Sequence, residues 1–232
     1  MPLSELEIAK KEIGSYLFSQ EYLAQFIEQS GGLFKQEWFK YYKRDEYEDY
    51  DDKGYLFKNE VFRYDGKTVS TKDLRIICAV DLATSTRESA DFTVATTIGV
   101  DKQQNIFVLE VVRKRLEAPD VIKLLESIHE KWNPDVIGVE SAGYQLALIQ
   151  IIKRQTSLPI VRLKADKDKF SRALPLSAKM ESGLVYFPVN ALWYSDLEKE
   201  MLQFPDGEHD DQVDSLAYAI LQVAKRSKFV AY

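Results

Sequence analysis

The sequence predicts an α/β fold in which a mixed β-sheet, with three antiparallel strands followed by parallel strands, carries helices on both faces. Two observations predict this class. Apolar runs rich in Val, Ile and Thr at residues 75–82, 92–100 and 106–112 are separated by short connections, which favours antiparallel pairing. Beyond them, short apolar runs alternate with segments of helical periodicity, as in sheets whose parallel strands are joined by helices.

The elements that follow residue 112 are expected in a definite order. Pro119 opens a helix in which apolar residues recur at helical spacing, and Asn133 and Pro134 stop it. A short buried strand at 136–140 comes next. The other expected elements are helices at 143–156, 170–181, 192–203 and 210–226, and strands at 159–163 and 184–187.

Residues 1–70 are rich in aromatic and turn-forming residues and differ from the rest of the chain. We expect them to form an N-terminal arm or linker segment that is packed on, or leads into, a main domain at 71–232. Ser4 and Glu7 form a capping-box pattern that predicts a first helix. A second short helix is expected at 20–29.

Three further features are expected within this arm. The aromatic-rich segment 33–42 would dock onto another surface. Residues 45–52 contain six acids in eight positions and are expected to form a solvated loop. Residues 55–69 predict a hairpin that turns at Asp65 and Gly66.

Composition excludes several classes of protein. The 232 residues suffice for one or two domains, and no apolar run approaches the ~20 residues of a membrane-spanning helix. The single cysteine, Cys78, forms no internal disulfide, and two histidines are too few for a three-histidine zinc centre. A bound metal would therefore be held by carboxylates, which favours Mg²⁺ or Mn²⁺.

The net charge of −6 counts against a broadly basic nucleic-acid-binding protein. The acidic excess is local, however, because the six acids of 45–52 account for all of it. A basic groove elsewhere on the molecule therefore stays open.

Two acids end apolar strands. Asp81 closes the run at 75–82, and taken alone it is explained by turn-forming hydrogen bonds with Thr84 and Ser85. Glu140 follows an apolar run and precedes a turn into a helix. Taken alone, it is explained by an exposed strand end or by the favourable helix dipole.

A third group of acids lies at 208–214, ahead of the last helix. Asp210 is suited to cap the helix N-terminus, while Asp211 and Asp214 are three residues apart and share one helical face. Acids at a helix start need no functional explanation, but Asp214 lies a turn inside, next to the apolar stripe. Which of the three acids would bind a metal stays open.

The combination is more specific than its parts. The first and fourth strands of such a sheet would lie side by side, with the last helix crossing their carboxyl ends, so three or four carboxylates would meet. Like charges so close shift their own protonation, and a divalent cation removes the repulsion. Two cations about 3.5–4 Å apart can catalyse an in-line phosphoryl displacement.

In these motifs, the chain resembles the nuclease domain of large terminase subunits of tailed bacteriophages. These are DNA-packaging motor proteins, and the domain has an RNase H-like fold related to RuvC resolvases. The resemblance covers about 74–226. The motifs that carry it are Val80-Asp81-Leu-Ala, Asp91-Phe-Thr-Val, Val-Ile-Gly-Val-Glu140-Ser and His209-Asp-Asp211-Gln-Val-Asp214-Ser-Leu-Ala.

The resemblance implies a metal-dependent endodeoxyribonuclease that uses two Mg²⁺ or Mn²⁺ ions to cut concatemeric phage DNA with little sequence specificity. It implies Asp81, Glu140 and Asp211 as catalytic metal ligands, with Asp91 and Asp214 as accessory ligands. The implied partners are double-stranded DNA, the ATPase domain of the same full-length protein, and the portal and small terminase subunit. The implied location is the host cytoplasm, with no membrane contact.

Basic residues follow the fifth strand of the predicted sheet. Phosphate contacts from such residues would position a duplex without reading its bases, although a solvated loop explains them almost as well. The residues expected to contact DNA are Lys164, Lys167, Lys169 and Arg172.

Two rival functions stay open. A RuvC-like Holliday junction resolvase would prefer four-way junctions, and a catalytically silent RNase H-like module would dock a partner through 33–42. The sequence contains no Gly-x-x-x-x-Gly-Lys-Ser/Thr loop and thus no ATPase motif. We therefore expect either an excised C-terminal fragment or a stand-alone nuclease, and the start at Met1 ahead of linker-like sequence favours the fragment.

Overall fold

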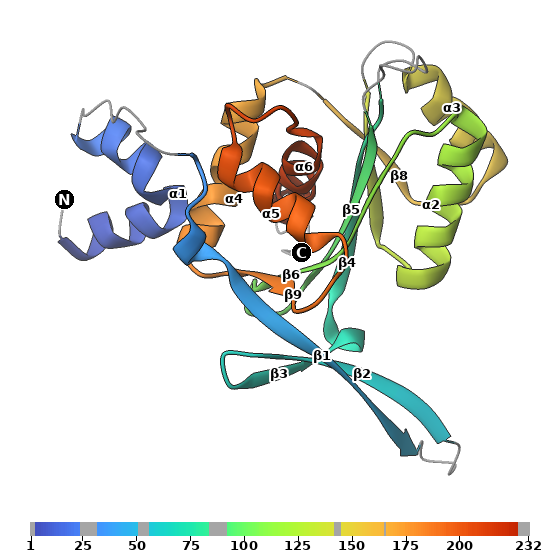
Figure 1. Ribbon diagram of the computed structural model, residues 1–232, viewed down its shortest axis with the longest axis horizontal. Helices are drawn as coiled ribbons and strands as arrows, with labels where there is room; N and C mark the ends of the chain where they lie inside the picture. The colour runs from blue at the N-terminus through green and yellow to red at the C-terminus, as the bar shows by residue number, and fades with distance from the viewer. Residues whose placement is uncertain are drawn as a thin grey trace.

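A mixed sheet of nine strands runs through the computed structural model, which describes residues 3–23, 32–50, 56–83, 92–141, 145–164 and 166–226. The strand order is β3-β2-β1-β9-β6-β5-β4-β7-β8, and helices lie on both sides of the sheet (Figure 1). The predicted α/β class is confirmed. The strands are β1 (Lys40–Tyr50), β2 (Leu56–Tyr64), β3 (Lys67–Ser70), β4 (Arg75–Asp81), β5 (Thr93–Val100), β6 (Ile106–Lys114), β7 (Val136–Glu140), β8 (Ile160–Leu163) and β9 (Val185–Pro188).

The helices follow the predicted order closely. They are α1 (Leu3–Leu23), α2 (Ala118–Trp132), α3 (Gln145–Gln155), α4 (Lys169–Glu181), α5 (Tyr194–Gln203) and α6 (Asp211–Arg226), with short 3₁₀ turns η1 (Gln36–Trp38) and η2 (Thr71–Asp73). α2 has Pro119 in its first turn and ends at Asn133, which adopts a left-handed conformation. None of the helices in the described ranges is long and apolar enough to cross a membrane.

The pairing of the strands is the predicted one. β4, β5 and β6 pair antiparallel in sequence, and β7 and β8 add in parallel beside β4. β9 then pairs in parallel with the other side of β6. β4 and β7, the first and fourth strands of the predicted set, are therefore neighbours.

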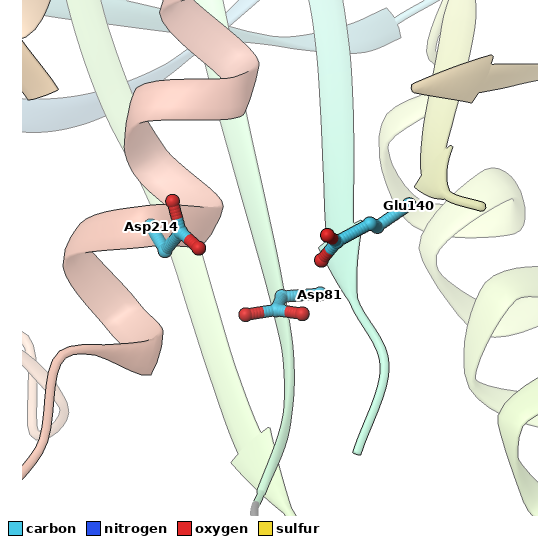
Figure 2. Close-up of side chains that lie close together, drawn as sticks. All are labelled: Asp81, Glu140 and Asp214. Atoms are coloured by element: carbon cyan, nitrogen blue, oxygen red, sulfur yellow. The ribbon is translucent and has the colours of Figure 1, made fainter. Parts of the chain in front are cut away.

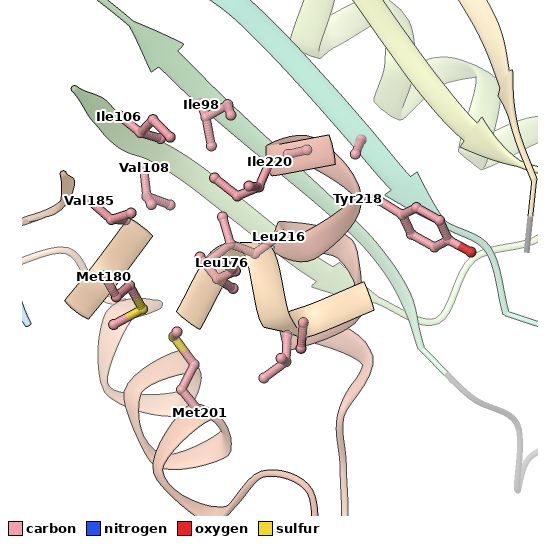
Figure 3. Close-up of a cluster of buried hydrophobic side chains, with 14 of the residues drawn as sticks. Ile98, Ile106, Val108, Leu176, Met180, Val185, Met201, Leu216, Tyr218 and Ile220 are labelled. Carbon is pink, nitrogen blue, oxygen red and sulfur yellow. The ribbon is translucent and has the colours of Figure 1, made fainter. Parts of the chain in front are cut away.

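Two apolar cores hold the helices against the sheet. α4, α5 and α6 cover one face, where Ile98 and Val108 of the sheet pack with Leu176, Leu216 and Ile220 of the helices (Figure 3). α2 and α3 cover the other face. β5 is buried at every position because it lies between both layers. Each fully buried Leu or Ile contributes about 1.5–3 kcal/mol of transfer free energy, so these layers fix the sheet on which the site is built.

The N-terminal arm extends the same sheet. The first residues of β1 pair in parallel with β9, whereas its later residues pair with β2 in a hairpin that projects from the body of the molecule (Figure 1). The predicted turn at Asp65 and Gly66 is confirmed, and both residues have positive φ, as tight hairpin turns require. The division of the chain at residue 70 stays a prediction.

The expectation of a loop at 45–52 is wrong for residues 45–50, which belong to β1. Two ion pairs between β1 and β2 help the strand to accommodate the charge. Arg63 contacts Asp45 at 2.6 Å, and Arg44 contacts Glu60 at 2.8 Å. Residues 51 and 52 lie outside the described residues.

Part of the aromatic segment 33–42 packs within the chain, whereas the sequence had left open whether it would contact a partner instead. Leu33, Phe34 and Phe39 are buried in the core beneath α4 and α5. The first predicted helix exists as part of α1, which is kinked at Gly14 (φ 81°) and continues to Leu23. A Cβ at Gly14 would lie 2.9 Å from the Ala178 Cβ, so glycine permits the close approach of α1 to α4. Most of the expected second helix at 20–29 lies outside the described residues.

Candidate metal centre

The site begins at the carboxyl ends of β4 and β7. These strands are parallel, with Val80 opposite Val139, so the next residue of each, Asp81 and Glu140, emerges at the same edge of the sheet. In each strand, the four residues before the carboxylate are buried. The sheet itself thus places the two acids side by side.

Helix α6 brings the third acid. The Ser215 hydroxyl in its first turns lies 3.1 Å from the carbonyl oxygen of Ala79 and 3.3 Å from that of Val94, which fixes the helix across β4 and β5. The preceding residue, Asp214, is only 3% exposed. One carboxylate oxygen each from Asp81, Glu140 and Asp214 lie within 4.8 Å of one another (Figure 2).

The acids repel one another strongly. Burial, a hydrogen bond with Glu140 and the negative charges of Glu140 and Asp214 raise the pKa of Asp81 from 3.8 to about 9. Burial also raises the pKa values of Asp214 and Asp211. Without a cation, the site therefore retains a proton at neutral pH. A divalent cation would take its place.

Arg172 of α4 holds Asp214 in position. Its Nε donates to Asp214 Oδ1 at 2.8 Å and its Nη2 to Oδ2 at 2.6 Å, while Nη1 donates to the carbonyl of Lys167. The guanidinium also lies 4.8 Å from the Tyr218 ring centroid. This two-point pair, with Arg172 itself only 5% exposed, offsets part of the acidic charge and fixes the carboxylate plane.

The three carboxylates open into a pocket of about 270 Å³ at the edge of the sheet. Asp211 lines this pocket but is outside the group of three whose oxygens converge. Lys169 also lines it, and its Nζ lies 2.6 Å from Asp210 Oδ1. The complete lining is Asp81, Leu82, Phe92, Glu140, Lys169, Arg172, Glu208, His209, Asp210, Asp211 and Asp214.

Asp210 occupies the predicted N-cap position of α6, where its carbonyl oxygen accepts from Asp214 N at 2.9 Å, but its side chain does not supply the expected cap. The Asp210 carboxylate pairs with Lys169, and the free amides of the first turn donate to Glu200 of α5 instead. Glu200 Oε1 accepts from Gln212 N at 2.6 Å and from Val213 N at 3.1 Å. A carboxylate from the preceding helix satisfies the helix start, and this leaves the local acids facing the pocket.

The predicted site residues fall into three groups. Asp81, Glu140 and Asp214 converge, with Asp211 on the wall of the same pocket. Lys164, Lys167 and Lys169 are exposed, whereas Arg172 is buried, and DNA contact by any of the four stays a prediction. Asp91 lies outside the described residues.

Sequence reasoning missed three parts of the site. Tyr218 lies one turn after Asp214 on α6, and burial followed by the charge of Glu140 raises its pKa. That spacing of four residues was a readable signal. Glu200, which accepts from the first turn of α6, and Arg113, whose charge acts on Asp211, carried no sequence signal because only the tertiary fold brings them to the site.

A mixed sheet of this order, with acids at the ends of two adjacent parallel strands and a third acid on the crossing helix, defines an RNase H-like protein. Residues 78–222 match the family described as the terminase RNase H-like domain, and the chain belongs to this family. A search of curated protein sequences finds no match.

Solved structures show the same fold. The large terminase nuclease from thermophilic phage G20c, solved with bound magnesium, is similar with a TM-score of 0.57 and 16% identity, over 83% of this chain and 98% of that one. The large terminase from another thermophilic bacteriophage, solved in complex with ADP, is similar with a TM-score of 0.64 and 10% identity. That match covers 97% of this chain and 52% of the ADP-bound terminase chain.

Proposed function

We propose that this chain is the metal-dependent DNA endonuclease of a viral DNA-packaging motor. It would cut concatemeric phage DNA, with little sequence specificity, by two-metal-ion hydrolysis of phosphodiester bonds. The convergence of Asp81, Glu140 and Asp214 within 4.8 Å carries the proposal. Membership of the terminase RNase H-like domain family supports it.

The residues present fit hard divalent cations. All candidate ligands are carboxylate oxygens, which suit Mg²⁺ or Mn²⁺, and the raised pKa of Asp81 reflects the repulsion that a cation would relieve. We assign Asp81, Glu140 and Asp214 to the central set and Asp211 to the neighbouring position on the pocket wall, with Asp91 as a further ligand. When bound, the ions would activate the attacking water and stabilise the leaving 3′-oxygen.

The role of Asp214 is compatible with its pairing to Arg172. Each carboxylate oxygen has two lone pairs, so an oxygen that accepts from the guanidinium retains one for a metal. Arg172 would thus hold the ligand in a single orientation. No described residue pairs with the Asp211 carboxylate in this way, which is consistent with a ligand that adjusts when the second ion binds.

The exposed lysines Lys164, Lys167 and Lys169 would contact the phosphates of double-stranded DNA. Such contacts position a duplex but carry no base information, which would account for the proposed low sequence specificity. The partner within the packaging motor would be an ATPase domain of the same full-length protein, because the chain matches about half of a large terminase that was solved with ADP. The portal and the small terminase subunit are further proposed partners, in the host cytoplasm.

Cleavage of supercoiled plasmid DNA in Mn²⁺ or Mg²⁺ tests the proposal. We expect Asp81→Asn to lower the rate by more than about 100-fold, because even outer-shell changes at metal sites cost 10–100-fold. The matched control is Asp206→Asn, which changes an exposed acid in the loop before α6. Equal cutting by wild type and Asp81→Asn would refute the proposal, and preference for a four-way junction over linear duplex would favour a resolvase.

A further inference from the structure

A second basic group lies at the end of β6, on the other side of the acidic site from Lys164–Lys169. β6 is antiparallel to β5, which is antiparallel to β4, so β6 and β4 point the same way and end at the same sheet edge. Arg113 is in the last residues of β6, opposite Val94, and Arg115 follows the strand. Alternation along the strand puts both on one face of the sheet.

Phe92 connects this group to the site. Its ring lies 3.9 Å from the Arg113 guanidinium carbon and 4.4 Å from that of Arg115, measured to the ring centroid. The His209 ring meets Phe92 edge-on, with centroids 6.0 Å apart. Phe92 and His209 both line the acidic pocket, so the arginines form the outer layer of its wall.

Two nitrogen donors of Arg113 find no acceptor in the part of the chain that the structure describes. Its Nε and Nη2 are buried and have no hydrogen-bond acceptor, and no ion pair joins Arg113 to any residue in the described ranges. Its charge does reach Asp211, where it opposes the rise in pKa that burial causes. Leaving a buried donor unsatisfied destabilises the folded protein. Arg113 as a whole is only half-buried, and its third guanidinium nitrogen, Nη1, is not among these buried atoms, so an oxyanion could approach the guanidinium there.

The spacing of the sheet matches a nucleic-acid strand crossing it. The order β6-β5-β4-β7-β8 places β6 and β8 two strands away from β4, on opposite sides. At about 4.8 Å between strands, each basic group lies about 10 Å along the edge from Asp81. A backbone whose scissile phosphate sits at Asp81 would therefore pass one basic group on each side.

We propose that Arg113, held flat against Phe92, binds a backbone phosphate of the DNA on the side of the cleavage position opposite the β8–α4 lysines. The assignment rests on the proposed nuclease function and extends its binding surface. Arg113 is a binding residue here, separate from the carboxylates. A guanidinium suits this role because its planar donors match phosphate oxygens while its face stacks on an aromatic ring.

Binding of a short fluorescent duplex tests the proposal, measured by anisotropy in the Asp81→Asn background, where cutting does not interfere. We expect Arg113→Gln to weaken binding about eightfold at about 0.1 M salt and to reduce the slope of log K against log salt by about 0.9, the value for one phosphate contact. Arg113→Lys should restore most of the slope. The control, Lys102→Gln, removes one charge at the opposite end of the β5–β6 hairpin and should change neither quantity.

Phe92→Leu gives an independent reading, because it removes the aromatic support without changing charge. It should weaken DNA binding while leaving the slope of log K against log salt unchanged. Melting temperatures of all variants show whether each of them is folded. If Arg113→Gln binds like Lys102→Gln, or if Phe92→Leu binds like the parent, Arg113 serves packing alone and the inference fails. If the variants fail in this way while the wild type still cuts plasmid DNA, only the inference about Arg113 is overturned. If the wild type does not cut plasmid DNA at all, the proposed nuclease function itself is overturned.

Discussion

Replacing Asp81 with asparagine should stabilise the metal-free protein. Asp81 has a pKa of about 9 in the folded protein and an ordinary value of 3.8 in the unfolded chain. Between these values the folded state binds a proton that the unfolded state releases, so the free energy of unfolding falls as pH rises through this window. Below about pH 4 both states are protonated, and above about pH 9 the full cost is reached.

The magnitude follows from the same two values. By pH 7 the linkage amounts to about 4 kcal/mol, which corresponds to a melting temperature about 8–16 °C lower in a protein of this size. Asp81→Asn removes the titrating group and one of the repelling charges. Its melting temperature in a chelator should therefore exceed that of the wild type at pH 7, and the difference should shrink toward pH 4.

Thermal and urea unfolding in EDTA, from about pH 4 to pH 9, measure this effect. Asp206→Asn serves as the control for a change of one exposed acid. Addition of Mg²⁺ or Mn²⁺ should raise the melting temperature of the wild type, because a ligand of the native state stabilises it, and should have much less effect on Asp81→Asn. Parallel pH profiles for wild type and Asp81→Asn would refute the reasoning.

Three other substitutions test the rest of the structure. Arg172→Met leaves the buried Asp214 carboxylate without its partner and should cost about 3–5 kcal/mol; a loss below about 1 kcal/mol in urea unfolding would contradict the pairing. Glu200→Ala removes the acceptor for the first amides of α6 and should cost about 1–2 kcal/mol, seen also as faster amide exchange there. Phe62→Ala, in the fully buried aromatic cluster of the hairpin, should cost about 3–5 kcal/mol in a single transition. Two separate transitions would instead support a division at residue 70.

The predictable part of the fold was local. Within residues 75–226, apolar residues recur either at the two-residue period of strands or at the helical period, in separate segments. Asn133 and Pro134 mark the end of one helical segment. The strand formed by the acidic run was not predictable in this way. A run of acids predicts a solvated loop when it is considered alone. Only the tertiary structure shows that a partner strand with Arg63 and Glu60 lies beside it.

The meeting of acids at one edge of the sheet was predictable, whereas the choice among the acids of 210–214 was not. Asp81 and Glu140 end apolar strands, which marks them in the sequence, and adjacency of their strands follows from the fold class. Which of the acids at 210–214 faces the site depends on contacts with other helices. Arg172 is 42 residues from Asp214, and Glu200 caps α6 from another helix, so Asp214 faces inward while Asp210 turns to Lys169.

By itself, the amino-acid sequence determined how strands and helices alternate along the chain. It also determined that a metal would be bound by carboxylate oxygens, and which acids could provide them. These follow from periodicity and residue type, which are properties of neighbouring positions. Only the tertiary structure decided which carboxylates meet, which of them is paired to an arginine and which basic groups flank the edge. Those outcomes depend on strand order and helix placement, because electrostatic interactions act through distances in space that the spacing of residues along the chain does not specify.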